Sequence, residues 1–253
     1  MRFGLEVQKE VLSYWLFMIL PQLLRHFLRH RDDEVFYQMQ AEDAIRWLTA
    51  NRVIAAPGRT ALDLGCGHGV FGMALARQGW TVTFADAENL LRPNARTMPF
   101  RTIDLDRDSV SSLGHYDLVV CSNVLEHLAK PNRLLSEAST LLQPGGRFFL
   151  SWTNWLSPWG GHEFSPLHYL GPNWGPQLYD RMTGDPKRRF HRPFVNLFPT
   201  YIGEVLRTIR KEQRLELEAM APRYYTEFGF ILQLPVVREF LAWNCALLLR
   251  ARA

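Results

Sequence analysis

Short apolar runs alternate with amphipathic stretches along the chain, and this alternation predicts a parallel sheet covered by helices. Apolar runs at residues 61–64, 81–85 and 116–121 are bounded by glycine or charged residues, which is typical of buried parallel strands. Between the first two, apolar residues at helical spacing predict a helix over residues 70–78. Strands that alternate with helices in this way favour an α/β fold.

The later part of the chain continues the alternation. Apolar spacing predicts helices within residues 35–48, 131–142 and 201–210, and strands over residues 100–103, 147–151, 214–219 and 243–249. An apolar stretch at residues 228–240 contains Pro235, Arg238 and Glu239. Charged residues are costly inside a bilayer, so this stretch is a poor membrane span.

Residues 152–200 lack this periodicity. They hold four of the eight tryptophans and seven of the fifteen prolines. Loops of this length are usually functional or disordered, and aromatic richness argues against disorder. Because the segment follows the fifth predicted strand, it lies at the carboxyl ends where α/β sheets bind ligands. We therefore interpret it as a substrate lid.

The N-terminal residues 1–31 are apolar and basic. Residues 11–20 are almost wholly apolar, but a membrane span needs about 20 residues. Two glutamates precede this run and no cleavage site follows it, which disfavours a signal peptide. Residues 5–31 therefore predict either a helix in a membrane interface or a helix packed on the domain or on a second subunit. A single domain is expected over residues 32–253.

Composition limits the other classes of function. The chain of 253 residues has a net charge of +4, which fits an anionic partner or the inner face of a membrane without requiring either. Its three cysteines are far apart, as expected for reduced thiols in a cytoplasmic protein. No recognisable nucleic-acid module accompanies the basic residues, so no nucleic-acid partner is expected.

A glycine turn follows the first strand. Gly65, Gly67 and Gly69 stand at every second position before the predicted helix, whose free N–H groups and positive dipole end favour a nucleotide. Gly67, Gly69 and Gly72 also satisfy the Gly-x-Gly-x-x-Gly spacing of dinucleotide sites. Asp86 ends the next strand about 20 residues on, where an acid can accept from ribose hydroxyls.

Three motifs resemble the class I methyltransferases that use S-adenosylmethionine: Leu-Asp-Leu-Gly-Cys-Gly-x-Gly at 62–69, Asp-Leu-Val-Val-x-x-x-Val-Leu-Glu-His-Leu at 117–128, and Leu-x-Pro-Gly-Gly at 142–146. The chain is similar to the type 11, UbiE-like group, and residues 160–163 and 235–241 resemble an actinobacterial-type subgroup. The resemblance implies a Rossmann-like sheet of seven mostly parallel strands with helices on both faces, an antiparallel last strand and a lid inserted after strand 5. It also implies S-adenosyl-L-homocysteine as product.

The same resemblance implies which residues bind the cofactor. Asp63 would lie near the methionine ammonium, Asp86 at the ribose, and Asp104 at the adenine amino group. Asp104 can also be a turn acid, because Asp106 and Asp108 are close. The full implied set is Asp63, Gly65, Cys66, Gly67, Asp86, Asp104, Leu105, Ser122, Asn123 and His127.

Methyl transfer to oxygen or carbon usually needs a base, and the lid offers histidines. His162 and His168 are candidates for the base or for substrate contact, with Glu163 as an orienting partner. Alternatively, they bond the loop backbone and hold the lid closed. No metal site is expected from His162, Glu163 and His168, because their spacing is not that of a helical His-Glu-x-x-His motif.

The sequence thus favours O-methylation of a hydrophobic small molecule, a lipid or a lipid-linked sugar. The basic residues 187–192 suit a substrate phosphate or are a solvated surface. Two alternatives stay open. One is a non-catalytic interaction protein that keeps this fold and uses its N-terminal helix to form a homo-oligomer. The other is an NAD-binding Rossmann enzyme.

Overall fold

A computed structural model describes residues 34–54, 58–185 and 189–252. The predicted N-terminal segment 1–31 lies outside the described residues, as do Lys187 and Arg188. Within the described part of the chain, no helix is both long and apolar enough to cross a membrane.

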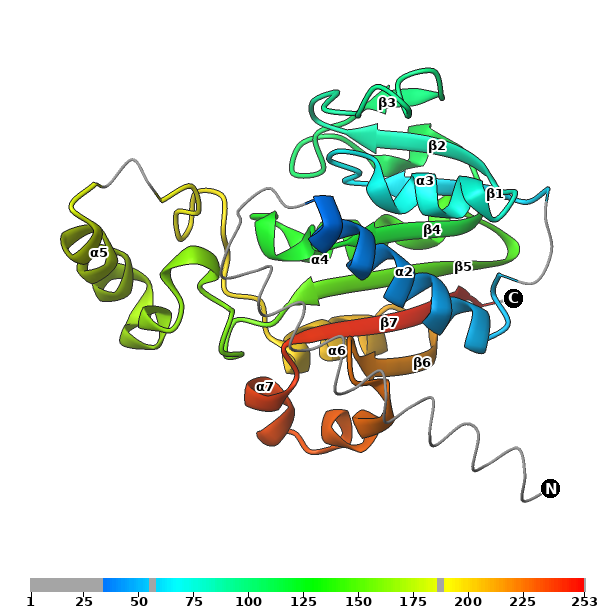
Figure 1. The fold of residues 1–253 in the computed structure, drawn as a ribbon. Helices are drawn as coiled ribbons and strands as arrows, with labels where there is room; N and C mark the ends of the chain where they lie inside the picture. Colours follow the sequence, from blue (N-terminus) through cyan, green and yellow to red (C-terminus); the bar gives the residue numbers. More distant parts are fainter. Residues whose placement is uncertain (1–33, 55–57, 186–188, 253) are drawn as a thin grey trace, which may run out of the picture.

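Seven strands form one sheet in the order β3-β2-β1-β4-β5-β7-β6 (Figure 1). Neighbouring strands are parallel from β3 to β5, whereas β7 is antiparallel to both β5 and β6. This arrangement confirms the predicted Rossmann-like fold. The strands are β1 Thr60–Leu64, β2 Thr81–Asp86, β3 Phe100–Thr102, β4 Tyr116–Ser122, β5 Leu142–Thr153, β6 Leu215–Pro222 and β7 Asn244–Ala251.

Helices cover both faces of the sheet and create two hydrophobic cores. α2 (Glu34–Ala50) and α3 (Val70–Arg77) cover one face, and α4 (Pro131–Glu137) and α6 (Ile202–Lys211) cover the other (Figure 1). Alternation along β1 divides its side chains between the two cores, with Leu62 and Leu64 on the α4 face. Asp63 therefore points toward α3, where its carboxylate bonds the helix backbone.

β5 begins earlier than the predicted strand 147–151. Its first residue, Leu142, pairs with Tyr116 of β4, and the register then shifts before Leu118 pairs with Arg147. The Pro-Gly-Gly turn at 144–146 therefore forms a bulge in the strand instead of preceding it. α4 correspondingly ends at Glu137 and continues as the 3₁₀ helix η3 (Ala138–Leu141).

The predicted lid contains a regular helix. α5 (Gly171–Thr183) lies beyond the carboxyl end of β5, preceded by the short 3₁₀ helices η4 (His162–Phe164) and η5 (Leu167–Leu170) (Figure 1). Pro172 is tolerated in its first turn, where backbone N–H groups have no helical partner. The remaining elements are η1 (Val110–Leu113), η2 (Leu125–His127), η7 (Thr226–Gln233) and α7 (Val237–Leu241).

Candidate functional site

Asp63 is a buried acid under the first turn of α3. Its Oδ2 accepts a hydrogen bond from the Gly72 N–H at 2.7 Å. A Cβ on Gly72 would lie 2.3 Å from Phe84 Cε1 and 2.9 Å from Asp63 Oδ2, so only glycine permits this close approach. Burial raises the pKa of Asp63 to about 7, and the nearby Asp86 charge adds to the increase. The hydrogen bond from Gly72 lowers the pKa but does not outweigh burial.

The glycine turn leaves main chain open on one side. The N–H groups of Gly65 and Cys66 donate to the Ala85 carbonyl at 2.8 and 3.2 Å, which fixes the turn against β2. Gly67 has φ +48°, and a Cβ built on it would meet no atom within 4 Å. A ligand can therefore approach Gly67 closely. Burial raises the pKa of the Cys66 thiol, so this cysteine is not a reactive nucleophile.

Asp86 ends β2 and faces the same turn. Its Oδ2 accepts from the Gly67 N–H at 2.8 Å, and its Oδ1 accepts from the Ala87 N–H at 2.7 Å. Carboxylate and glycine turn thus lie together, as expected if Asp86 binds a ribose beside Gly67.

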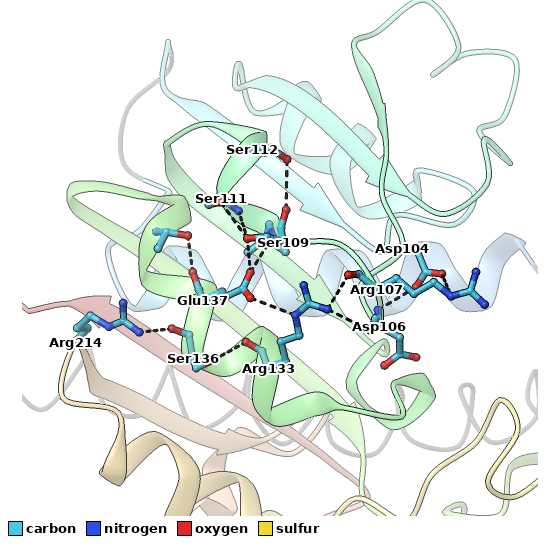
Figure 2. A network of polar contacts seen from close by, with 12 residues as sticks. Asp104, Asp106, Arg107, Ser109, Ser111, Ser112, Arg133, Ser136, Glu137 and Arg214 are labelled. Carbon is cyan, nitrogen blue, oxygen red and sulfur yellow. Dashed lines mark hydrogen bonds and ion pairs between the residues drawn. The ribbon is translucent and has the colours of Figure 1, made fainter.

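Asp104 holds the turn after β3, as Figure 2 shows. Its Oδ1 accepts from the Asp106 N–H at 3.0 Å, and its Oδ2 lies 3.3 Å from Arg107 Nε. The Asp104 carboxylate thus makes the contacts expected of a turn acid. Its contact with the adenine amino group stays a prediction. Leu105 is buried in the core on the α4 face.

Ser122 and Asn123 belong to a polar network at the end of β4. Asn123 adopts φ +57°, and its Nδ2 donates to Gln40 Oε1 of α2 at 3.1 Å. Asn244 Nδ2 of β7 donates to Asn123 Oδ1 at 2.7 Å. The network therefore joins β4, β7 and α2 at the carboxyl edge of the sheet.

Arg223 places a buried positive charge in this network. Only 2% of its surface is exposed. Its Nη1 donates to Ser122 Oγ at 2.9 Å and to Ser151 Oγ at 3.0 Å, and its Nη2 donates to the Gln40 carbonyl at 2.8 Å. Sequence reasoning missed Gln40, Arg223 and Asn244, because no local motif marks them.

Three histidines from separate segments form a second cluster. The ring centroids of His127 and His162 are 5.3 Å apart, as are those of His127 and His191, and those of His162 and His191 are 4.3 Å apart. The sequence marks His191 only as part of the basic run 187–192. Glu163 pairs with His191, through both the ring and the backbone N–H, and not with His162 or His168.

His162 and His168 have different environments. Burial, followed by the nearby His191 and His127, holds the pKa of His162 well below its ordinary value. His168 is 1% exposed, and its Nε2 lies 3.0 Å from the Ser157 carbonyl. Burial lowers its pKa also. His168 thus makes the backbone contact expected of a residue that holds the lid closed.

The comparisons with known proteins agree with the motifs. A family model described as a methyltransferase domain matches residues 27–184. A protein of Mycobacteroides abscessus named as an uncharacterized methyltransferase is 32% identical over 238 residues, covering 87% of this chain and 88% of that protein. The chain belongs to the methyltransferase family. A similarly named relative from Mycobacterium avium is 32% identical over 251 residues, with 90% and 93% coverage.

Solved structures share the fold of this methyltransferase. An S-adenosylmethionine-dependent methyltransferase from Clostridium acetobutylicum gives a TM-score of 0.58 at 12% identity, covering 94% of this chain and 99% of that chain. One from Mesorhizobium loti gives 0.54 at 20% identity, covering 83% and 99%. Family and fold confirm the predicted class I S-adenosylmethionine-dependent enzyme and its cofactor, and they favour this class over the NAD alternative.

Replacement of Asp86 by alanine is expected to weaken S-adenosylmethionine binding by about 1–3 kcal/mol, or about 5- to 150-fold, because the ribose hydroxyls lose their acceptor. Isothermal calorimetry measures this directly. Glu88→Ala, which removes an exposed acid two residues later, is the matched control and should bind normally. Unchanged affinity in Asp86→Ala would remove this residue from the ribose site.

Proposed function

We propose that this methyltransferase transfers the methyl group of S-adenosylmethionine to an oxygen of a hydrophobic small molecule, a lipid or a lipid-linked sugar. The observation that carries the proposal is an apolar stripe along the lid. Leu170, Trp174, Leu178 and Met182 follow one another at every fourth residue and are 53%, 72%, 37% and 72% exposed. An exposed apolar surface of this kind is typical of a binding site for an apolar partner.

The basic run 187–192 offers less support for a phosphate-bearing acceptor. Arg189 already binds Asp180 through two hydrogen bonds, Nε to Oδ1 at 3.0 Å and Nη2 to Oδ2 at 2.9 Å. A guanidinium occupied in this way is not available to grip a phosphate. Arg189 therefore gives no support for a phosphate on the acceptor, and the proposal rests on the apolar stripe.

Of the two histidines predicted to act as base or to contact the substrate, His162 is better placed. It is partly buried among His127 and His191, whereas the ring of His168 is buried against Ser157. A free imidazole whose pKa is held well below its ordinary value is a weak base at neutral pH. We therefore assign His162 to contact with the acceptor and Glu163 to orientation of His191.

Deletion of residues 1–28 is expected to reduce membrane binding. Residues 11–20 are apolar and several basic residues follow, a composition that binds anionic interfaces. Co-sedimentation with anionic phospholipid vesicles compares the full chain with the truncated chain. If the truncated protein pellets as well as the full chain, residues 1–28 are not the membrane contact.

A methyl-transfer assay tests the proposed acceptor class. The protein is incubated with methyl-labelled S-adenosylmethionine and either a lipid extract or a water-soluble extract of cells. Label should pass into the lipid extract, with S-adenosylhomocysteine as the second product. Binding of S-adenosylmethionine without transfer to either extract would favour the non-catalytic alternative. Transfer only to water-soluble compounds would overturn the hydrophobic acceptor.

A further inference from the structure

The cluster of His127, His162 and His191 has the geometry of a metal-ligand set. Each histidine offers one ring nitrogen, and these three nitrogens lie within 4.8 Å of one another. In a tetrahedral zinc site, nitrogens bound at about 2.0–2.1 Å are about 3.3 Å apart, so modest side-chain rotations would bring this set to ligand distance. The three residues come from η2, η4 and the loop that follows α5.

Hydrogen bonds orient each imidazole for this task. His127 Nδ1 lies 2.7 Å from the Asn196 carbonyl, and His191 Nδ1 contacts the Glu163 carboxylate. His162 Nδ1 makes a longer contact of 3.4 Å with the Gly160 carbonyl. A carbonyl oxygen can only accept, so the proton of a bonded ring belongs on Nδ1, and Nε2 keeps its lone pair. Metal-bound histidines usually have this second hydrogen bond to a carboxylate or carbonyl.

A carboxylate lies directly behind one of the three histidines. Glu163 Oε1 accepts from the His191 backbone N–H at 2.7 Å, and Glu163 Oε2 contacts His191 Nδ1. This contact leaves the other ring nitrogen of His191 facing the cluster, where a cation would be favoured by the nearby acid.

The backbone of His162 supports the same interpretation. His162 adopts φ +51°, in the left-handed region that non-glycine residues rarely occupy. Conformations of this kind cluster at functional sites. Here the conformation belongs to the residue whose ring lies beside both other histidines.

We propose that His127, His162 and His191 bind a divalent transition-metal ion, best matched by zinc, through their Nε2 atoms. Three histidines with a fourth position open are a known zinc arrangement, and imidazole suits zinc better than it suits magnesium or calcium. The ion connects η4 and the loop after α5 to η2, and thereby fastens the lid segment to the end of β4. This site departs from the sequence prediction, which considered His162, Glu163 and His168 as ligands and expected no metal.

The open fourth position of the metal is a place where the acceptor could bind. This inference rests on the proposed function. Zn²⁺ with three neutral imidazoles and the Glu163 carboxylate leaves one net positive charge, which favours an anionic oxygen as fourth ligand. His162 would then contact the acceptor through the metal and not as a free base. The metal site itself does not depend on which acceptor binds.

Metal analysis and calorimetry on tag-free, full-length protein test the proposal. Protein stripped with a chelator and titrated with Zn²⁺ should bind one ion per chain, and Co²⁺ in its place should give the visible absorption of a tetrahedral site. The double variant His162→Ala/His191→Ala should lose this binding. Glu163→Gln should bind Zn²⁺ about 10- to 100-fold more weakly, because Glu163 positions His191 without touching the metal. The exposed His115→Ala is the matched control and should bind Zn²⁺ normally.

S-adenosylmethionine binding is measured on every variant, because it reports folding, and the substituted residues His162, Glu163 and His191 lie outside the predicted cofactor set. A variant that binds the cofactor but not zinc supports the site. The proposal is overturned if the wild-type protein binds cofactor but no zinc, or if the double variant keeps one zinc per chain. Failure of cofactor binding in the wild-type protein would instead count against the methyltransferase function.

Discussion

Replacing Gly67 with valine is expected to abolish S-adenosylmethionine binding while the domain stays folded. Gly67 has φ +48°, and a Cβ there would enter the open space beside the turn. Valine would place two methyl groups where the ligand must approach the main chain. The left-handed conformation itself costs a non-glycine residue about 1–2 kcal/mol, too little to unfold a typical domain.

Gly145→Val separates backbone strain from ligand exclusion. Gly145 also has positive φ, +75°, and a Cβ on it also meets nothing within 4 Å, but it lies in the turn at the opposite edge of the sheet. Both variants should lose similar thermal stability, and only Gly67→Val should lose cofactor binding in calorimetry. Full binding by Gly67→Val would place the cofactor elsewhere.

The carboxyl of Asp63 is expected to make the cofactor-free protein less stable as pH rises. Its pKa is about 7 in the folded state, against an ordinary value of 3.8 for an exposed aspartate, so between these values the folded state binds the additional proton. Stability is then lost as pH rises from about 4 to 7, by up to about 4 kcal/mol. Asp63→Asn should remove this dependence, which urea unfolding at pH 5 and pH 8 measures.

The affinity for S-adenosylmethionine should change with pH in the opposite direction to stability, because of the same Asp63 carboxyl. The methionine ammonium, expected beside Asp63, favours the ionised carboxylate, so affinity should rise as pH rises through about 7. Calorimetry of wild type and Asp63→Asn across this range makes the comparison. An equal pH dependence in the two proteins would show that Asp63 does not meet the ammonium.

The sequence predicted those elements of the fold whose local apolar pattern matches their burial in the finished structure. Short apolar runs located β1, β2 and β4 to within a residue, because buried parallel strands are apolar on both faces. α5 was missed because the prolines of the lid argue against regular structure. Pro172 occupies a position where a helix loses no hydrogen bond, although Pro176 lies inside the helix.

In the candidate site too, residues brought together by local structure were predicted and residues brought together by long-range packing were missed. Asp63, Gly67 and Asp86 were predicted because one strand-turn-helix unit and the following strand bring them together. Arg223 meets Ser122 across 101 residues of sequence, and His191 meets His127 across 64. Those contacts depend on how the end of β6 and the segment 152–200 pack against the rest of the sheet, which no local pattern encodes.

β7 separates β5 from β6, so a nascent chain cannot assemble its sheet in the order in which the ribosome makes it. β6 leaves the ribosome first and has no partner in the sheet until residues 244–251 follow it. Until then β5 presents a free edge with apolar side chains such as Phe149 and Trp152, which are fully buried in the finished protein. An unpaired strand edge of this kind can pair with another chain, so insertion of this late strand is the step that closes the sheet to such pairing.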